Sequence, residues 1–244
     1  MNTGIIIQAR MGSSRFPGKV LRTLDETSKS LLGMIVSRLQ IGLSELPVIV
    51  ATSTNVIDDE IEKWCVTQRV PVYRGSEKNV LERFVQTAKK FGLEQVIRVC
   101  SDNPFINPKL ILNLLKLQDG SYDYISYRVS GVPAIKTHYG IFAELARLTA
   151  LETELQSGLM RSREHVTAGL YEQADYKRKW IDIDLPEDIR LTIDTEDDFG
   201  LIRKILRKEQ LLPDGKSLQE WMNNIAQDQD VMKTMKDQIQ RQGK

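Results

Sequence analysis

The sequence predicts an α/β fold, a Rossmann-like three-layer sandwich with a mainly parallel sheet and a C-terminal helical tail. Short apolar runs alternate with amphipathic segments of helical period from the first residues onward. The apolar runs are continuous, which is typical of strands buried on both faces of a parallel sheet. Hydrophobic residues make up 41% of the 244 residues, which suffices for one large domain.

The expected strands are short runs rich in β-branched residues. They lie at residues 4–9, 47–51, 70–73, 95–100 and 123–127, with late candidates at 180–184 and 190–193. The expected helices carry apolar residues on one face. They lie at residues 30–43, 58–68, 77–91, 107–117, 142–153, 162–172, 195–207 and 217–240. Asn107 is the expected cap of its helix, and Pro108 follows it in the first turn.

The chain divides into a single α/β domain at residues 1–212 and a polar helical extension at 213–244. Residues 130–180 are the least regular part of the domain. We interpret them as an insertion that forms an acceptor lid, and a plain β-extension is the alternative. After Pro213 the composition becomes rich in Gln, Asp and Lys, and the last helix has only a thin apolar stripe.

Composition excludes several classes of protein. The net charge is +1, from 34 basic and 33 acidic residues, so the domain-wide basic excess of nucleic-acid-binding proteins is missing. No apolar stretch approaches the ~18 residues that span a membrane, and the N-terminus does not resemble a signal peptide. The two cysteines, Cys65 and Cys100, do not form a disulfide framework. We therefore expect a cytoplasmic protein.

A basic loop, residues 8–19, follows the first expected strand and is the first candidate site. Arg10, Arg15 and Lys19 can neutralise a polyphosphate, the arginines through forked donors and the lysine as a point charge. Glycine lets backbone N–H groups approach an oxyanion. The expected nucleotide contacts in this loop are Ala9, Gly12, Ser13 and Ser14. The spacing matches neither a Walker A loop nor GxGxxG. A solvated basic turn is the alternative interpretation.

Six motifs carry a family resemblance that extends from about Ile5 to Leu206. They are QARMGSSRFPGKVL, VIVATSTNVIDDEI, VYRGSEKNVLERF, RVCSDNPFINP, SREHVT and RLTIDTEDDF. Together, and in this order, they resemble the cytidylyltransferases that activate acidic sugars, namely the acylneuraminate and 3-deoxy-manno-octulosonate enzymes. The resemblance is greatest to the branch named after spore coat polysaccharide biosynthesis protein F.

The resemblance implies a fold of the nucleotide-diphospho-sugar transferase type and transfer of CMP from CTP to a sugar or sugar-acid hydroxyl. Pyrophosphate leaves, the product enters surface polysaccharide synthesis, and relatives are often dimers. It also implies that Asp102 and Asp194 hold Mg²⁺, which prefers one or two carboxylates plus phosphate oxygens. Asp102 could instead be a turn residue, and Asp194 or Thr195 a helix cap. Some relatives have a second aspartate where this chain has Thr192.

Base selection is expected near Thr52, Arg74 and Ser76, which follow the second and third strands. Backbone carbonyls together with an arginine or serine can distinguish cytosine from uracil, because the wrong base leaves polar groups unpaired. Ordinary turn chemistry is the alternative for Thr52 and Ser76.

The acceptor end departs from the family pattern. Lys136 and His138 stand in residues 131–142, where relatives commonly have an acidic group. This indicates either a more acidic acceptor or one that is not a sugar acid. His165 is expected to have a packing or hydrogen-bonding role. Two other functions stay open: a metal-dependent glycosyltransferase that uses a nucleotide sugar, and a catalytically silent nucleotide-binding scaffold.

Overall fold

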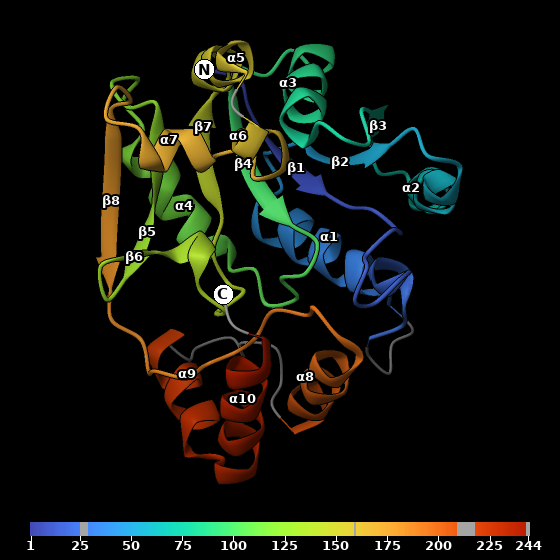
Figure 1. Cartoon of the computed structure of the whole chain (residues 1–244), viewed down its shortest axis with the longest axis vertical. Coiled ribbons are helices and arrows are strands. Elements are labelled where there is room, and N and C mark those ends of the chain that lie inside the picture. Colours follow the sequence, from blue (N-terminus) through green and yellow to red (C-terminus); the bar gives the residue numbers. More distant parts are fainter. Residues whose placement is uncertain (25–28, 159, 209–217, 243–244) are drawn as a thin grey trace.

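The computed structural model describes residues 1–24, 29–158, 160–208 and 218–242. In these residues the strands form one eight-stranded sheet, with the order β3-β2-β1-β4-β7-β5-β6 and with β8 paired to β5 (Figure 1). The strands are β1 Thr3–Gln8, β2 Val48–Ser53, β3 Val72–Gly75, β4 Gln95–Cys100, β5 Tyr124–Val129, β6 Val132–Pro133, β7 Glu144–Arg147 and β8 Arg178–Ile183. The expected α/β sandwich with a mainly parallel sheet is confirmed.

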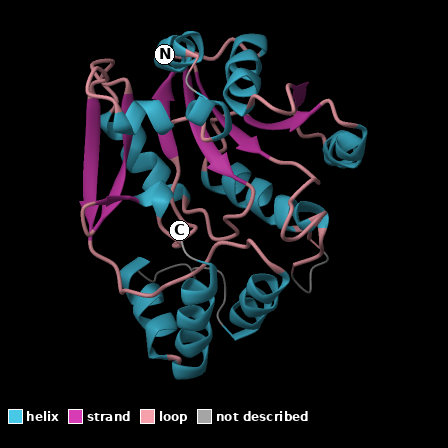
Figure 2. Ribbon diagram, viewed as in Figure 1, coloured by secondary structure: helices cyan, strands magenta, loops and turns pink. Residues whose placement is uncertain are grey.

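Helices flank the sheet on both faces (Figure 2). They are α1 Leu31–Gly42, α2 Asp59–Gln68, α3 Val80–Lys90, α4 Pro108–Leu117, α5 Leu148–Ser157, α6 Met160–Glu164, α7 Ala168–Glu172, α8 Glu196–Lys208, α9 Leu218–Gln227 and α10 Gln229–Gln242. The core on one face includes residues of α1, α2 and α4, and the core on the other includes residues of α3, α5 and α7. Two predicted helix starts are confirmed. The Asn107 side chain caps α4 by accepting from the Lys109 N–H, with Pro108 in the first turn, and the Ser30 side chain caps α1 by accepting from the Gly33 N–H.

β1 to β4 are parallel, whereas β7 is antiparallel to both β4 and β5. The sequence predicted a helix over 142–153, and its first part is wrong. Residues Glu144–Arg147 are strand β7, and helix α5 begins at Leu148. Glu, Leu, Ala and Arg are all good helix formers. Tertiary pairing with two neighbouring strands overrides this local preference, as it commonly does for strands.

Three other expected elements differ from the structure. Residues 190–193 do not belong to a strand, although Leu191 is apolar and Thr192 and Ile193 are β-branched, and they form an extended connection instead. The helix expected over 162–172 is divided into α6 and α7. The helix expected over 217–240 is two helices, and Asp228 between them accepts from the Val231 N–H at the start of α10. The boundary expected at residue 213 lies outside the described residues.

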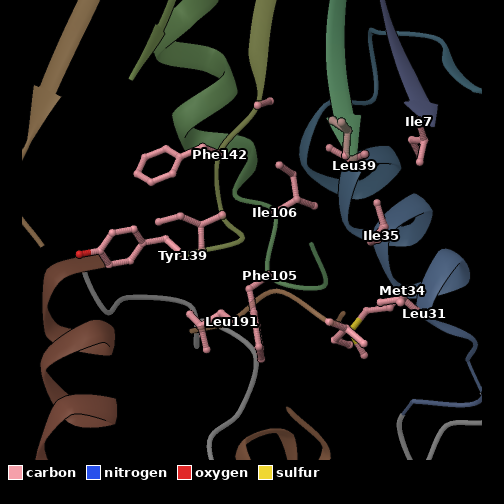
Figure 3. Close-up of a cluster of buried hydrophobic side chains, with 14 of the residues drawn as sticks. Ile7, Leu31, Met34, Ile35, Leu39, Phe105, Ile106, Tyr139, Phe142 and Leu191 are labelled. Atoms are coloured by element: carbon pink, nitrogen blue, oxygen red, sulfur yellow. The ribbon is translucent and has the colours of Figure 1, made fainter. Parts of the chain in front are cut away.

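The core extends from the sheet into the loops beyond its carboxyl edge. Side chains of α1 meet Phe105 and Ile106 from the turn after β4, together with Leu191 from the extended connection (Figure 3). α9 packs against the same turn, because the ring centroids of Trp221 and Phe105 are 5.1 Å apart. α8, α9 and α10 lie together beyond the carboxyl end of β4 (Figure 1). The C-terminal helices therefore support the turns at the edge of the sheet where ligands of such folds bind.

None of the helices in the described residues is long and apolar enough to cross a lipid bilayer.

The packing of α9 predicts that Trp221→Ala lowers the free energy of unfolding by about 3–5 kcal/mol, the usual cost of truncating a buried tryptophan. Trp221 is fully buried. The matched control is Ile41→Ala, because Ile41 is 80% exposed and its truncation should change stability by less than about 0.5 kcal/mol. Urea denaturation measures both. Equal, small changes in the two variants would show that the C-terminal helices do not stabilise the domain.

Candidate active site

A cleft of about 770 Å³ opens at the carboxyl edge of the sheet. One end is formed by the basic loop after β1, the floor by the ends of β1, β4 and β7, and the other end by residues of the 130–180 segment. The residues that line it include Gln8, Arg10, Ser13, Ser14, Arg15, Lys19, Arg98, Cys100, Asp102, Lys136, Gly140, Glu144, Glu164, His165, Thr192 and Asp194.

The basic loop is fixed at both ends. The Ala9 N–H donates to the Ala51 carbonyl at 3.2 Å, and the Met11 N–H donates to Asp58 Oδ1 at 2.7 Å. Gly18 closes the loop with a φ of +72°, and its N–H donates to the Met11 carbonyl. Asp58 is buried and was not expected to contribute. The Asp58 carboxylate, at the start of α2, thus holds the basic loop against the end of β2.

Five of the expected loop residues line the cleft: Arg10, Ser13, Ser14, Arg15 and Lys19. Ala9 is buried behind the loop, and Gly12 lies beside Ile57. Lys19 is only 8% exposed, and its ammonium donates to the Ile193 carbonyl. The loop therefore brings its charges to one end of the cleft, and Lys19 also connects it to the extended segment 190–194.

The two expected metal ligands both line this cleft. The Ile193 N–H donates to the Asp102 carbonyl at 2.9 Å, which ties the turn after β4 to the residue before Asp194. Asp194 Oδ1 accepts from Arg15 at 2.8 Å, and its Oδ2 accepts from Arg190 at 3.0 Å. Arg15 is half exposed. The Asp194 side chain is therefore held from the protein side by Arg190 and from the loop side by Arg15.

The donor set fits a hard divalent cation that keeps much of its hydration shell. Both candidate ligands are carboxylates, and no cluster of three or more His, Cys, Asp and Glu side chains occurs in the part of the chain that the structure describes. Two carboxylates suit Mg²⁺, which completes its octahedron with water and phosphate oxygens. Thr192 is buried in the cleft wall, and its hydroxyl has no hydrogen-bond partner among the described residues.

Thr52, Arg74 and Ser76 are not among the residues that line the cleft. Arg74 forms ion pairs with Asp59 at 2.6 Å and Glu62 at 2.9 Å, and it also donates to the carbonyls of Ser53 and Asn55. Ser76 Oγ accepts from the Asn79 N–H ahead of α3. Thr52 is fully buried, and its hydroxyl lacks a partner among the described residues. Arg74 and Ser76 thus fix the turns that follow β2 and β3.

Sequence reasoning missed a buried polar network on the cleft floor. Arg98 on β4 pairs with Glu144 on β7, and Glu144 also accepts from the hydroxyls of Tyr124 and Thr167. Burial alone would lower the Arg98 pKa, but the neighbouring Cys100 and Glu144 raise it above its ordinary value. Burial, followed by the Glu144 charge, raises the pKa of Tyr124. No local pattern could reveal this network, because it depends on the antiparallel pairing of β7.

The two candidate acceptor residues have different positions. Lys136 lines the cleft, pairs with Glu172 at 3.0 Å, and lies over the Tyr171 ring. His138 instead points to Arg190, with 2.6 Å between His138 Nδ1 and Arg190 Nη1. His165, expected to pack or to form hydrogen bonds, lines the cleft beside Glu164.

The comparisons with known proteins agree with this geometry. A protein-family model described as cytidylyltransferase matches residues 4–212. Over 222 residues the chain is 34% identical to spore coat polysaccharide biosynthesis protein SpsF of Bacillus subtilis (strain 168), which covers 86% of this chain and 88% of the relative. It is 33% identical over 106 residues to 3-deoxy-manno-octulosonate cytidylyltransferase of Alteromonas mediterranea, covering 43% of this chain and 42% of that enzyme.

Solved structures show the same fold. A cytidylyltransferase from Leptospira borgpetersenii superposes with a TM-score of 0.82 at 26% identity, covering 95% of this chain and 97% of that one. CMP:2-keto-3-deoxy-manno-octonic acid synthetase complexed with CTP gives a TM-score of 0.65 at 16% identity, covering 85% and 99%. The manganese complex of Rv0371C from Mycobacterium tuberculosis gives 0.56 at 11% identity, covering 83% and 97%.

Gly140 lies in close contact with the backbone of the extended segment, where a larger residue does not fit. Its φ is +62°, and a Cβ there would lie 2.8 Å from the Leu191 carbonyl oxygen. Gly140→Ala should therefore lower stability by about 2 kcal/mol or more, from strain and displacement of the extended segment. Gly131→Ala is the control, since Gly131 has a φ of +77° but no atom within 4 Å of a Cβ. Chemical denaturation compares them, and equal losses would refute the contact.

Proposed function

The chain belongs to the cytidylyltransferase family, and we propose that it transfers CMP from CTP to a hydroxyl group of a sugar or sugar acid, releasing pyrophosphate. The observation that carries this proposal is the meeting of the basic loop and the two carboxylates in one cleft. Cations at one end suit a triphosphate, and the opposite end has room for a second substrate.

The proposed reaction is an in-line attack of the acceptor hydroxyl on the α-phosphorus. The hydroxyl oxygen forms the new P–O bond, the bond to the β-phosphate bridging oxygen breaks, and the hydroxyl proton is lost to solvent. Such transfers depend on positioning and charge neutralisation more than on covalent catalysis. Arg10, Arg15 and Lys19 would stabilise the triphosphate and the departing pyrophosphate. Ala9, Gly12, Ser13 and Ser14 would shape the loop around the phosphates.

Asp102 and Asp194 would hold a divalent cation, which we propose to be Mg²⁺. When bound, such an ion orients phosphate oxygens and neutralises their charge. One structure of the same fold is described as a complex with manganese. Arg15 is half exposed and is paired with Asp194, so a phosphate group can replace the carboxylate as its partner. Nucleotide binding would thereby free Asp194 Oδ1 to face the metal.

Base selection remains assigned to the turns that hold Thr52, Arg74 and Ser76. The donors of Arg74 are engaged with carboxylates and carbonyls, so its role would be to shape the turns that present backbone groups to cytosine. The base would be read by those backbone groups, while the buried Thr52 and the turn-fixing hydroxyl of Ser76 would help to hold them in place.

The acceptor would lie against the 130–180 segment, which contributes β6, β7 and β8 to the sheet and also lines the cleft. The names of the matched relatives point to sugar acids and to polysaccharide synthesis. We propose the cytoplasm as the compartment, because both cysteines are unbridged and CTP is made there.

Asp102→Asn tests the reaction. Turnover should fall by about 10²–10³-fold or more, because a ligand to the phosphate-bound cation loses its charge, while stability stays near that of the wild type. The measurement is pyrophosphate release from CTP and Mg²⁺ with a panel of sugar acids and neutral sugars. Asp182→Asn is the control, because Asp182 is an exposed partner of Arg128 at the sheet edge. Near-normal turnover in Asp102→Asn would overturn the metal assignment. Hydrolysis of a nucleotide sugar without pyrophosphate release would favour a glycosyltransferase.

Nucleotide preference is tested by thermal unfolding with CTP, UTP, ATP or GTP, with and without Mg²⁺. A ligand that binds only the folded state at ~100 times its Kd stabilises it by about 2.7 kcal/mol. For a chain of this length that corresponds to roughly 5–10 °C. We expect the largest shift with CTP and an increase on adding Mg²⁺. Equal shifts for all four nucleotides would contradict the base assignment.

A further inference from the structure

Arg190 is a fully buried guanidinium, 1% exposed, at the start of the extended segment 190–194. Its Nε and Nη2 donate to the two carboxylate oxygens of Asp198, at 2.8 and 2.9 Å. Nη2 also donates to Asp194 Oδ2 at 3.0 Å, and Nη1 lies 2.6 Å from His138 Nδ1. One side chain therefore contacts a proposed metal ligand, the first turn of α8 and the loop before β7.

We propose that Arg190 is a positioning residue of the active site, which holds the Asp194 carboxylate at the cleft and joins it to the loop that carries His138. The inference rests on the proposed function, because it assigns Arg190 a role through a metal ligand of that site. Arg190 does not line the cleft, so it acts through Asp194 and not on the substrate.

Asp194 is restrained in both its side chain and its backbone. Arg190 fixes Oδ2, which leaves Oδ1 on the side of the half-exposed Arg15. Asp198 Oδ2 accepts from the N–H groups of Asp194 and Thr195, both at 2.9 Å. Asp198 is itself oriented by the two-pronged bond from Arg190, so the guanidinium controls both restraints. A lysine would supply the charge without the planar fork that binds two carboxylates at once.

The same guanidinium joins Asp194 to the acceptor side of the cleft. A guanidinium only donates, so His138 Nδ1 is the acceptor and the ring carries its proton on Nε2. The His138 carbonyl accepts from the N–H groups of Leu191 and Thr192, at 2.8 and 3.2 Å. Gly140, two residues on, lines the cleft and touches the Leu191 backbone. The loop beside the acceptor end and the segment bearing Asp194 thus form one hydrogen-bonded unit.

The experiment measures Mn²⁺ binding to the CTP-loaded protein without acceptor, by electron paramagnetic resonance of the free ion. Arg190→Lys should raise the Mn²⁺ Kd about tenfold or more, the usual effect of removing the partner of a metal ligand. Arg190→Met should raise it further, so that the lysine variant shows partial rescue. In turnover assays kcat should fall more than the KM for CTP rises, because the basic loop is intact in both variants.

Met235→Ala is the matched structural control. Met235 is fully buried, and its sulfur accepts from the Arg190 N–H at 3.4 Å, so its truncation loosens the same segment and leaves the guanidinium in place. It should lower the melting temperature as much as Arg190→Lys does, while the Mn²⁺ Kd stays within about twofold of the wild type. Equal Mn²⁺ weakening in the two variants would reduce Arg190 to a stabilising residue and overturn the proposal.

Two further variants keep the test decisive. His138→Ala removes one contact of the guanidinium and keeps the Arg190 charge, so it should raise the Mn²⁺ Kd by less than Arg190→Lys does. An unchanged Kd in both variants would refute the proposal. Where the Arg190 variants do not fold, the Mn²⁺ Kd of His138→Ala decides alone. Asp194→Asn separates failure of the metal assignment from failure of the inference about Arg190. If it keeps wild-type Mn²⁺ affinity, the metal assignment fails, and this inference fails with it. If Asp194→Asn loses Mn²⁺ but Arg190→Lys does not, only the inference fails.

Discussion

The cleft depends on the hydrogen bonding of one extended segment, residues 190–194, which does not belong to the sheet. Its backbone groups cannot be satisfied by strand neighbours, and buried N–H and C=O groups need partners. Other parts of the chain supply them, among which are the turn after β4, the loop before β7 and Lys19 of the basic loop. The bonds run from Ile193 to Asp102, from Leu191 and Thr192 to His138, and from Lys19 to Ile193. Elements far apart in sequence therefore converge at the site.

Charge follows the same arrangement. Asp198, Arg190, Asp194 and Arg15 form, in that order, a chain of alternating sign that begins in the core and ends at the cleft. Burial raises the Asp198 pKa, but the bonds from Arg190 outweigh burial and hold that pKa below its ordinary value. Breaking such a chain by removing one partner leaves an uncompensated buried charge, which is far costlier than the pair is stabilising. The inner members are thereby fixed, and only Arg15, at the exposed end, is able to exchange its partner.

Local patterns were sufficient to predict β1 to β5 and the helices between them, because continuous β-branched runs and capping residues are encoded within a few positions. They failed where the outcome depends on tertiary pairing. Residues 144–147 are good helix formers but lie between β4 and β5, where their backbone groups complete two strand ladders. Residues 190–193 have the composition of a strand, yet the N–H groups of Leu191, Thr192 and Ile193 bond to loops. In both cases the partners lie far away in the sequence.

The order of the motifs located the basic loop and the two aspartates, which the structure brings into one cleft, but it could not reveal how charge is distributed along that cleft. The insertion of β7 places Glu144 against Arg98, 46 residues earlier in the chain, and Glu172 pairs with Lys136. Both cations at the acceptor end therefore have acidic partners, whereas Arg10 lines the opposite end without an ion pair among the described residues. In the proposed reaction this difference would draw the triphosphate to the basic loop. The acceptor end, whose charges are already balanced, would then recognise its substrate by hydrogen bonds and shape, so the lysine there would not require a highly acidic acceptor.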